Sequence, residues 1–324
     1  MSSMDPRDDY LHPIGPEPNF NESMYFQFHD AAHRFGGFLR LANRPNEGRG
    51  ERTVCLYLPS GDVAFGFARP AFPDNDRFCA AGLSLDVVTP LEHLRAAYDG
   101  SVNVVSEPAA MVHPKAALPS SPMVDCHVRL QFRAAAPPYA ETFDGEGESF
   151  APNHYEQLMS VAGIVSVGGD SFDISGYGLR DHSWGPRSWQ APWFYRWVHG
   201  STAGFGFMGA YFGSPDGGDR RGGFVWDGDS VHPCDDVVVS TNRGPDHQQR
   251  SIAVELRSGE RRWSIHGQVD ASIPLRHRNR DGLSTTRIVE SATTWTAAGR
   301  SEHLHGMAEY LDQVLDGLPV GLRV

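Results

Sequence analysis

Short segments in which apolar and polar residues alternate recur along the whole chain, with turn-forming residues between them. For example, Thr53 to Leu58 and Val63 to Ala68 flank the turn Pro59 to Asp62, which predicts a β-hairpin. The 35 glycines and 23 prolines are dispersed, which favours many turns over long helices. Because strands recur at intervals of about ten residues, we expect an all-β protein built from antiparallel barrels or sandwiches. The other expected strands are 83–88, 102–106, 127–132, 163–167, 172–176, 193–198, 205–212, 224–226, 237–240, 252–256, 263–269 and 286–296.

Two segments favour helix over strand. Leu91 to Tyr98 is compatible with a short helical turn. Glu302 to Leu318 is compatible with a short C-terminal helix, which Gly306 and Pro319 would limit.

The length of 324 residues suits two domains of about 150 residues each. We expect a flexible N-terminal arm at 1–20 and a first β-domain at 21–140. Few periodic apolar residues occur between Ala134 and Pro152, so a linker is expected at 141–152. The second β-domain then spans 153–324.

The charge balance excludes several classes of partner. Lysine and arginine number 28 against 40 aspartate and glutamate, which gives a net charge of −12. We therefore expect no nucleic-acid partner and no anionic membrane surface. No apolar run approaches the roughly 18 residues of a membrane span. The polar start of the chain lacks the apolar core of a signal peptide.

The four cysteines, Cys55, Cys79, Cys126 and Cys234, form no CxxC pair. We interpret them as reduced thiols of a cytoplasmic protein. There is no GxGxxG after a strand, and no P-loop, HExxH or GxSxG motif, so no nucleotide or other cofactor is expected. The sequence leaves open whether the chain forms a homodimer.

The segment from Gly176 to Trp197 is the densest in aromatic and charged residues, with four of the seven tryptophans. If this segment is extended, Arg180, His182 and Trp184 project from one face and Asp181 from the other. On the inner face of a barrel, His182 can act as an acid or a base, and the ring of Trp184 can stabilise a carbocation.

On the opposite face, Asp181 can accept a hydrogen bond from an imidazole or hold Arg187. The alternative is structural, because an indole packed under an arginine, here Trp184 with Arg187, often closes the end of such a barrel.

Two further polar groups stand out. His154 and Glu156 share a face if extended, and could help to bind a metal or act as an acid–base pair; the alternative is a hydrogen-bonded strand edge. Glu22 could bridge the two domains or cap a turn. His303 and His305 have metal-like spacing without a third ligand nearby, so no essential metal is expected.

The motif Arg180 to Arg187, RDHSWGPR, resembles that of an uncharacterised group of two-domain bacterial proteins. More distantly, Asp181 to Gly185 is similar to the DHxWG motif of the carotenoid 1,2-hydratase (hydroxyneurosporene synthase) superfamily. That superfamily includes AttH-like proteins and decalin-forming pericyclases. The resemblance implies two lipocalin-like β-barrels packed together, with an apolar ligand at or near their junction.

In the hydratases, the histidine and tryptophan of the motif are implicated in protonating an alkene and holding the cation. These roles carry over to His182 and Trp184. A downstream tyrosine and an acid also matter in that family. Tyr211 is the candidate tyrosine here, but Gly213 stands near the place where an acid is expected.

Two hypotheses follow. The first is an acid-catalysed hydratase, cyclase or isomerase, without a cofactor, for a terpenoid, polyketide or steroid-like substrate. His182 would be the acid, Asp181 would orient it, and Glu156 would be an alternative acid. The second is a carrier of hydrophobic small molecules, which needs a cavity but no titratable group facing it. The residues expected to bind the substrate are His154, Arg180, Trp184, Arg187, Trp193, Tyr195, Trp197 and Tyr211.

Overall fold

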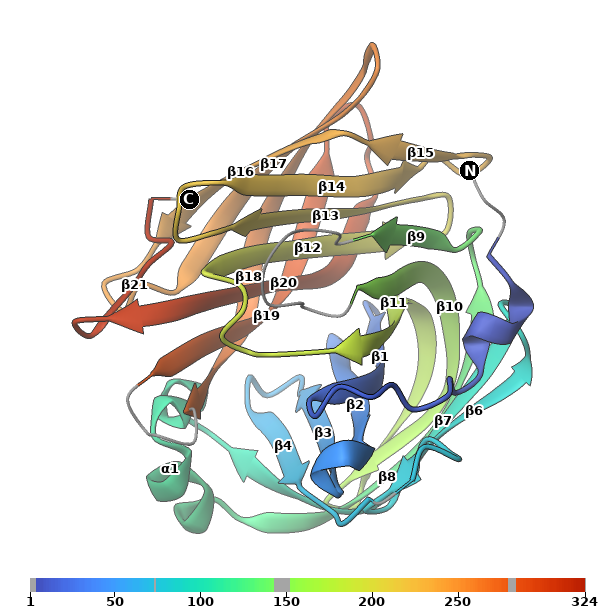
Figure 1. Ribbon diagram of the computed structural model, residues 1–324, viewed down its shortest axis with the longest axis vertical. Helices are drawn as coiled ribbons and strands as arrows, with labels where there is room; N and C mark the ends of the chain where they lie inside the picture. The colour runs from blue at the N-terminus through green and yellow to red at the C-terminus, as the bar shows by residue number, and fades with distance from the viewer. Residues whose placement is uncertain (1–3, 73, 143–151, 279–283, 324) are drawn as a thin grey trace. The chain divides into compact units, whose positions relative to one another are not determined.

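The computed structural model describes residues 4–72, 74–142, 152–278 and 284–323 (Figure 1). Two antiparallel sheets contain nearly all of the regular structure in these ranges, which confirms the expected all-β class. The chain divides into two compact units. Unit 1 comprises Met1–Ser106 and Ser120–Ser188, and unit 2 comprises Glu107–Pro119 and Trp189–Val324.

This division differs from the boundary that we expected at 141–152, most of which lies outside the described residues. The strands β10 (Asn153–Val167) and β11 (Asp170–Pro186) belong to unit 1. The reason is strand pairing, since β10 pairs with β8 (Met123–Ala134) and β11 pairs with β1 (Phe20–Asp30). The RDHSWGPR motif is therefore part of the first unit.

The sheet of unit 1 follows the order β4-β3-β2-β1-β11-β10-β8-β7-β6-β5. An additional pairing of β4 with β7 closes the sheet on itself. Phe26 and Phe28 of β1 point into the enclosed core, where Phe26 packs against the edge of Phe132 at 4.8 Å between ring centroids. The other elements are η1 (Pro6–Asp9), β2 (Phe35–Arg44), η2 (Pro45–Glu47), β3 (Arg49–Tyr57), β4 (Val63–Ala68), β5 (Cys79–Ala80), β6 (Leu83–Thr89), β7 (His93–Val105) and β9 (Tyr139–Thr142).

The sheet of unit 2 follows the order β15-β14-β13-β12-β20-β19-β18-β17-β16, and β21 pairs with β20. Its core is built around Trp295, which is fully buried and meets Phe207 edge-on at 5.2 Å. The elements are η3 (Pro108–Val112), α1 (Pro114–Ser120), β12 (Phe194–Thr202), β13 (Phe205–Gly213), β14 (Asp219–Trp226), β15 (Val231–Cys234), β16 (Asp236–Arg243), β17 (Gln249–Ser258), β18 (Arg261–Arg278), β19 (Thr285–Ala297), β20 (His303–Leu315) and β21 (Leu318–Pro319).

Both helical expectations are wrong. The segment 302–318 forms β20, which is paired on both sides by β12 and β19 and buried on both faces along most of its length. Burial on both faces removes the alternation of polar and apolar residues by which a strand is recognised. The segment 91–98 lies mostly in β7, where Leu94, Ala96 and Tyr98 alternate toward the core.

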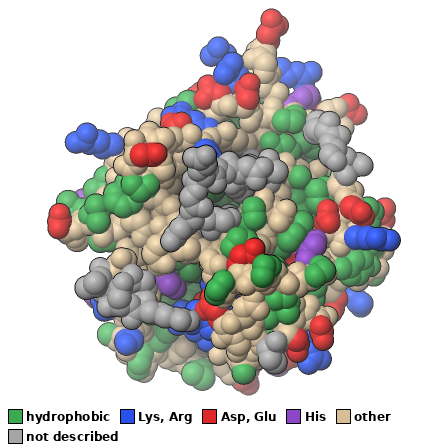
Figure 2. Space-filling view, viewed as in Figure 1, with side chains coloured by type: hydrophobic (Ala, Val, Ile, Leu, Met, Phe, Trp, Pro, Cys, Tyr) green, Lys and Arg blue, Asp and Glu red, His purple; other side chains and the backbone are tan. Residues whose placement is uncertain are grey.

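The surface carries charges of both signs. On the face drawn in Figure 2, acidic and basic side chains of the described residues are interspersed with apolar ones. No helix in the described ranges is long and apolar enough to cross a membrane.

Candidate functional site

The RDHSWGPR motif lies on β11, between β1 and β10. The strand register places His182 opposite Met24 of β1 and Tyr155 of β10, and it places Arg180 opposite Phe26. Because Met24 and Phe26 belong to the core of unit 1, the face that carries Arg180, His182 and Trp184 points inward, as the alternation predicts.

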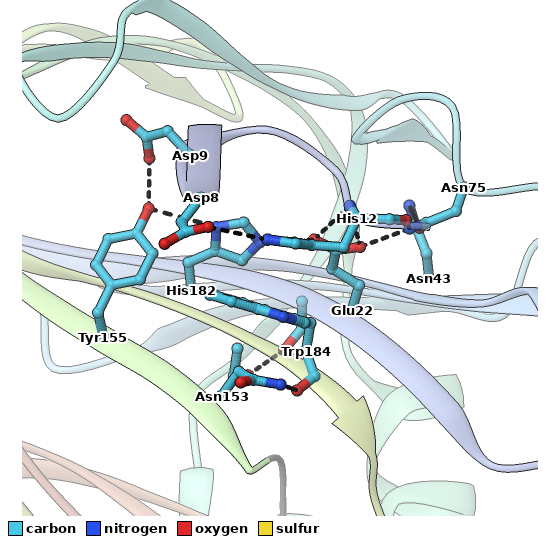
Figure 3. A network of polar contacts seen from close by, with 12 residues as sticks. Asp8, Asp9, His12, Glu22, Asn43, Asn75, Asn153, Tyr155, His182 and Trp184 are labelled. Atoms are coloured by element: carbon cyan, nitrogen blue, oxygen red, sulfur yellow. Dashed lines mark hydrogen bonds and ion pairs between the residues drawn. The ribbon is translucent and has the colours of Figure 1, made fainter. Parts of the chain in front are cut away.

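The imidazole of His182 is fully buried among aromatic rings. Its Nε2 atom lies 3.0 Å from Glu22 Oε1, and its Nδ1 atom lies 3.4 Å from the hydroxyl of Tyr155 (Figure 3). The rings of Trp184 and Phe78 lie 5.2 and 5.6 Å from it, centroid to centroid. We expected this ring to face an apolar cavity, but polar and aromatic side chains enclose it.

His12, Glu22, Tyr155, His182 and Trp184 form an inner cluster, and Glu22 lies at its centre. Its carboxylate accepts hydrogen bonds from His12 Nδ1 at 2.7 Å, from the backbone N–H of His12 at 3.0 Å, and from Asn75 Nδ2. Burial opposes ionisation of Glu22, but the hydrogen bonds from His12 and His182 outweigh it and lower the pKa of the carboxyl to about 2. Burial likewise opposes protonation of His12, yet Glu22 and Asp8 raise its pKa.

A second buried charge pair adjoins the cluster. Asp9 is fully buried and accepts hydrogen bonds from Arg180 Nη1, from the hydroxyl of Tyr155 and from the backbone N–H of Leu91. Arg180 also donates two hydrogen bonds to Gln157 Oε1, at 3.0 and 2.7 Å. Burial raises the pKa of Tyr155 well above its usual value of 10, so the phenol stays protonated and donates.

The N-terminal segment completes the inner cluster. The described residues before β1 were expected to form a loose arm. Instead, the structure places Asp9 in the core and stacks the ring of His12 on Trp184, with centroids 3.8 Å apart and planes 9° from parallel. Trp184 therefore packs against an imidazole, while Arg187 reaches Ser183 Oγ at 3.3 Å on the opposite face.

The other face of β10 and β11 carries an outer cluster of His154, Glu156 and Asp181. His154 Nε2 donates a hydrogen bond to Asp181 Oδ2 and lies 3.5 Å from Glu156 Oε1. The side chains of His154 and Asp181 are 10 and 15% exposed, and that of Glu156 is 1% exposed. Burial opposes ionisation of Asp181, but the charge and hydrogen bond of His154 outweigh it and lower the carboxyl pKa.

This arrangement corrects one role that the sequence suggested. Asp181 was expected to orient His182, but it projects from the opposite face and binds His154. The partner that orients His182 is Glu22. The ligand atoms of each cluster lie within 4.8 Å of one another, so both clusters have the donor spacing of a metal site.

Four of the expected substrate-binding residues belong to unit 2. Tyr195 donates a hydrogen bond to Glu309, and the ring of Trp197 lies 4.8 Å from that of His199. Tyr211 lies under the guanidinium of Arg221, at 4.3 Å. The backbone N–H of Trp193 donates to Gly213. The residues that we expected to line one pocket with His182 therefore belong to two separate compact units.

Sequence reasoning missed Asp9 and His12, and it considered Glu22 only as a bridge between the domains or as a cap. Glu22 offered a signal, because it alternates with Phe20, Met24 and Phe26, and a carboxylate in an inward-facing series must find partners. No sequence pattern could have identified Asp9 and His12, because apolar residues do not recur periodically in the segment before β1.

A family model described as "Domain of unknown function (DUF7064)" matches residues 5–314. No curated protein matches the sequence. Among solved structures, a putative AttH from Nitrosomonas europaea is 13% identical, with a TM-score of 0.56, and the match covers 96% of each chain. CghA with Sch210972 is 12% identical, with a TM-score of 0.55 and coverage of 92% of this chain and 88% of that one. Kievitone hydratase from Nectria haematococca is 8% identical, with a TM-score of 0.60 and coverage of 97 and 94%. At these identities the similarity shows a shared fold.

Proposed function

Because the chain belongs to the DUF7064 family, a domain of unknown function, its activity must be argued from its own site, and we propose that it is a hydratase or an isomerase of a hydrophobic small molecule. The enzyme would transfer protons with its own side chains, without a redox or nucleotide cofactor. Kievitone hydratase shares the fold and supports a hydration reaction by analogy.

One observation supports the proposal: the Nε2 atom of His154 faces two carboxylates, those of Asp181 and Glu156, on the partly exposed face of β10 and β11. An imidazole that is fixed by one carboxylate and adjoins another is a common general acid–base arrangement. His182 and Glu22 of the inner cluster are fully buried, so these two side chains are less suited to touch a substrate.

The outer cluster can complete a hydration cycle. Protonated His154 gives its proton to one carbon of an alkene, and the other carbon becomes a cation. Water adds to that carbon and releases a proton to Glu156, so the net change is addition of one water molecule. Because His154 Nε2 and Glu156 Oε1 are 3.5 Å apart, the proton can return to His154. Isomerisation follows if the cation loses a different proton to Glu156.

In this mechanism Asp181 and His182 are positioning residues and do not contact the substrate. Asp181 fixes the orientation of the His154 ring by accepting its Nε2–H. His182, on the opposite face of the same strand, ties β11 to Glu22 of β1. Trp184 packs on His12 in that inner cluster and is a positioning residue as well.

The substrate class remains part of the proposal. The superfamily resemblance of the motif supports a terpenoid, polyketide or steroid-like compound. The structure of CghA was solved with the small molecule Sch210972, which is consistent with a small-molecule ligand for this fold.

The test uses the compound that co-purifies with the full chain, identified by mass spectrometry, together with kievitone as a second probe. Each is incubated with the protein in ¹⁸O-labelled water, and the products are analysed by mass spectrometry. We expect incorporation of one labelled water, or a change of retention time without a change of mass for an isomerase. His154→Gln should lower turnover at least about a hundredfold, because positioned proton transfer contributes about 10²–10⁴ in rate.

The matched control is His33→Gln, since His33 also pairs with an aspartate in unit 1 but is 44% exposed and lies apart from the outer cluster. Full turnover by His154→Gln would overturn the assignment. If the co-purifying compound binds but is always recovered unchanged, the chain is a carrier.

A further inference from the structure

We propose that the inner cluster is a binding site for a divalent transition metal, with zinc as the first candidate, and that His12, Glu22 and His182 are its ligands. This site is separate from the outer cluster and does not depend on the proposed reaction. Its function would be to fasten the segment before β1 to the strands β1 and β11.

The three ligand atoms already converge. Glu22 Oε1 lies 2.7 Å from His12 Nδ1 and 3.0 Å from His182 Nε2. In a tetrahedral zinc site with bonds of about 2.0–2.1 Å, neighbouring donor atoms lie about 3.3 Å apart. A separation larger by a few tenths of an ångström would therefore admit the ion. Two imidazole nitrogens and one carboxylate oxygen form a donor set that zinc commonly takes.

The hydrogen bonds of Tyr155 fix the proton on His182. The single hydroxyl proton of Tyr155 is donated to Asp9, and Arg180 donates a further hydrogen bond to the same oxygen at 2.8 Å. The phenol oxygen can therefore only accept from His182 Nδ1, 3.4 Å away. When a metal displaces the proton of Nε2, Nδ1 keeps its proton and donates to Tyr155, and the lone pair of Nε2 binds the ion.

Both ring nitrogens of His12 face carboxylates, since Nε2 lies 3.4 Å from Asp8 Oδ1 and Nδ1 lies 2.7 Å from Glu22 Oε1. Without a metal, Nδ1–H donates to Glu22. A metal ion would displace that proton and bind the Nδ1 lone pair, and Nε2–H would stay directed at Asp8.

A metal ion would bind all three donor atoms at once, in place of the protons that the two imidazoles direct at Glu22. The ring nitrogens that point away from Glu22, His12 Nε2 and His182 Nδ1, also fit a metal site. Metal-bound histidines usually donate their second N–H to a carboxylate or another oxygen. Asp8 and Tyr155 are such acceptors here.

Two of the three ligands are fully buried. The side chains of Glu22 and His182 are fully buried, while that of His12 is 19% exposed. Three protein ligands leave one position for water, the open coordination that zinc enzymes use, and water can approach from the side of His12. The ion would join residues that are 10 and 160 positions apart, and so would link the segment before β1 to β1 and β11.

The experiment measures metal binding by the full chain. The protein is stripped with a chelator, its zinc content is checked by elemental mass spectrometry, and Zn²⁺ or Co²⁺ is added back. We expect one ion per chain, a rise in Tm with added Zn²⁺, and the visible absorption of four-coordinate Co²⁺. His12→Gln and Glu22→Gln should each lose the Co²⁺ spectrum and the rise in Tm.

His154→Gln is the control, because it alters the outer cluster, which has the same kind of donors. It should keep the Co²⁺ spectrum of the unmodified chain. His12→Gln changes a residue outside the strands, so its fold is checked by circular dichroism. The proposal is overturned if the stripped chain takes up no ion, or if a folded His12→Gln chain binds Co²⁺ like the unmodified one.

Discussion

At the scale of single residues, this chain depends on buried polar side chains that are satisfied by partners distant in sequence. Arg180 is 1% exposed, and its charge is compensated by Asp9, 171 positions earlier. Such pairs contribute little net stability, but an unpaired member is costly, so they fix one arrangement of the segments that supply them. Here they fix the segment before β1 against β10 and β11.

His199 of unit 2 is a buried titratable side chain that, within the described part of the chain, has no charged partner to compensate for its burial. It is 1% exposed, its Nε2 atom finds no hydrogen-bond partner among the described residues, and burial lowers its pKa to about 3. The folded state therefore resists protonation that the unfolded chain accepts below about pH 6.5. Stability should be intact above that pH and should fall by about 1.4 kcal/mol per pH unit as the pH drops further toward 3.

Between pH 6.5 and 5, this residue should cost the chain about 2 kcal/mol of unfolding free energy, measured by urea denaturation at each pH. His199→Leu removes the titrating group and should remove that part of the acid-side loss. His303→Gln, which changes an exposed histidine of β20, should leave the loss unchanged. An identical pH profile for the unmodified and His199→Leu chains would refute this account.

At the scale of elements, β1 and β11 approach so closely that neither Gly176 nor Gly178 has room for a Cβ atom. A Cβ atom on Gly178 would lie 1.9 Å from the carbonyl oxygen of Gln27. Gly178→Ala should therefore push the two strands apart and lower the unfolding free energy by about 1–3 kcal/mol, the usual cost of overpacking. Gly204→Ala is the control, because its Cβ would meet nothing within 4 Å. Equal urea midpoints for the two variants would contradict the expected strain.

The hairpin of β3 and β4 could be predicted from the turn residues Pro59 to Asp62, although β3 is buried on both faces. The inward face of Arg180, His182 and Trp184 follows from the alternation of side chains along an extended strand. β20 could not be predicted in this way, since Met307, Ala308 and Tyr310 are all buried and give no alternation. The partners of His182 could not be predicted either, because they depend on which strands pair.

At the scale of the whole molecule, the division into units follows strand pairing, not local composition. The acidic, proline-containing stretch before β10 suggested a linker, yet β10 and β11 lie within the sheet of unit 1, between β1 and β8. Unit 2 is also discontinuous, because Glu107–Pro119 belongs to it while the strands on either side belong to unit 1. Pairing between strands that are distant in sequence produces no recognisable sequence pattern at the boundary between the units.

The discontinuity of unit 2 can be tested with fragments. Residues 107–119 contain η3, which packs on β18, and Met111 of η3 is fully buried. A fragment of residues 189–324 lacks this cover, so apolar surface of β18 would be exposed to water. Joining 107–119 to that fragment through a flexible linker should raise its unfolding free energy by about 2–5 kcal/mol, the cost of removing a large buried apolar side chain. The comparison is made by urea denaturation, with the same linked fragment carrying Met111→Ala as the control that should lose most of the gain. If the fragment of 189–324 alone were as stable as the linked one, residues 107–119 would have no part in unit 2.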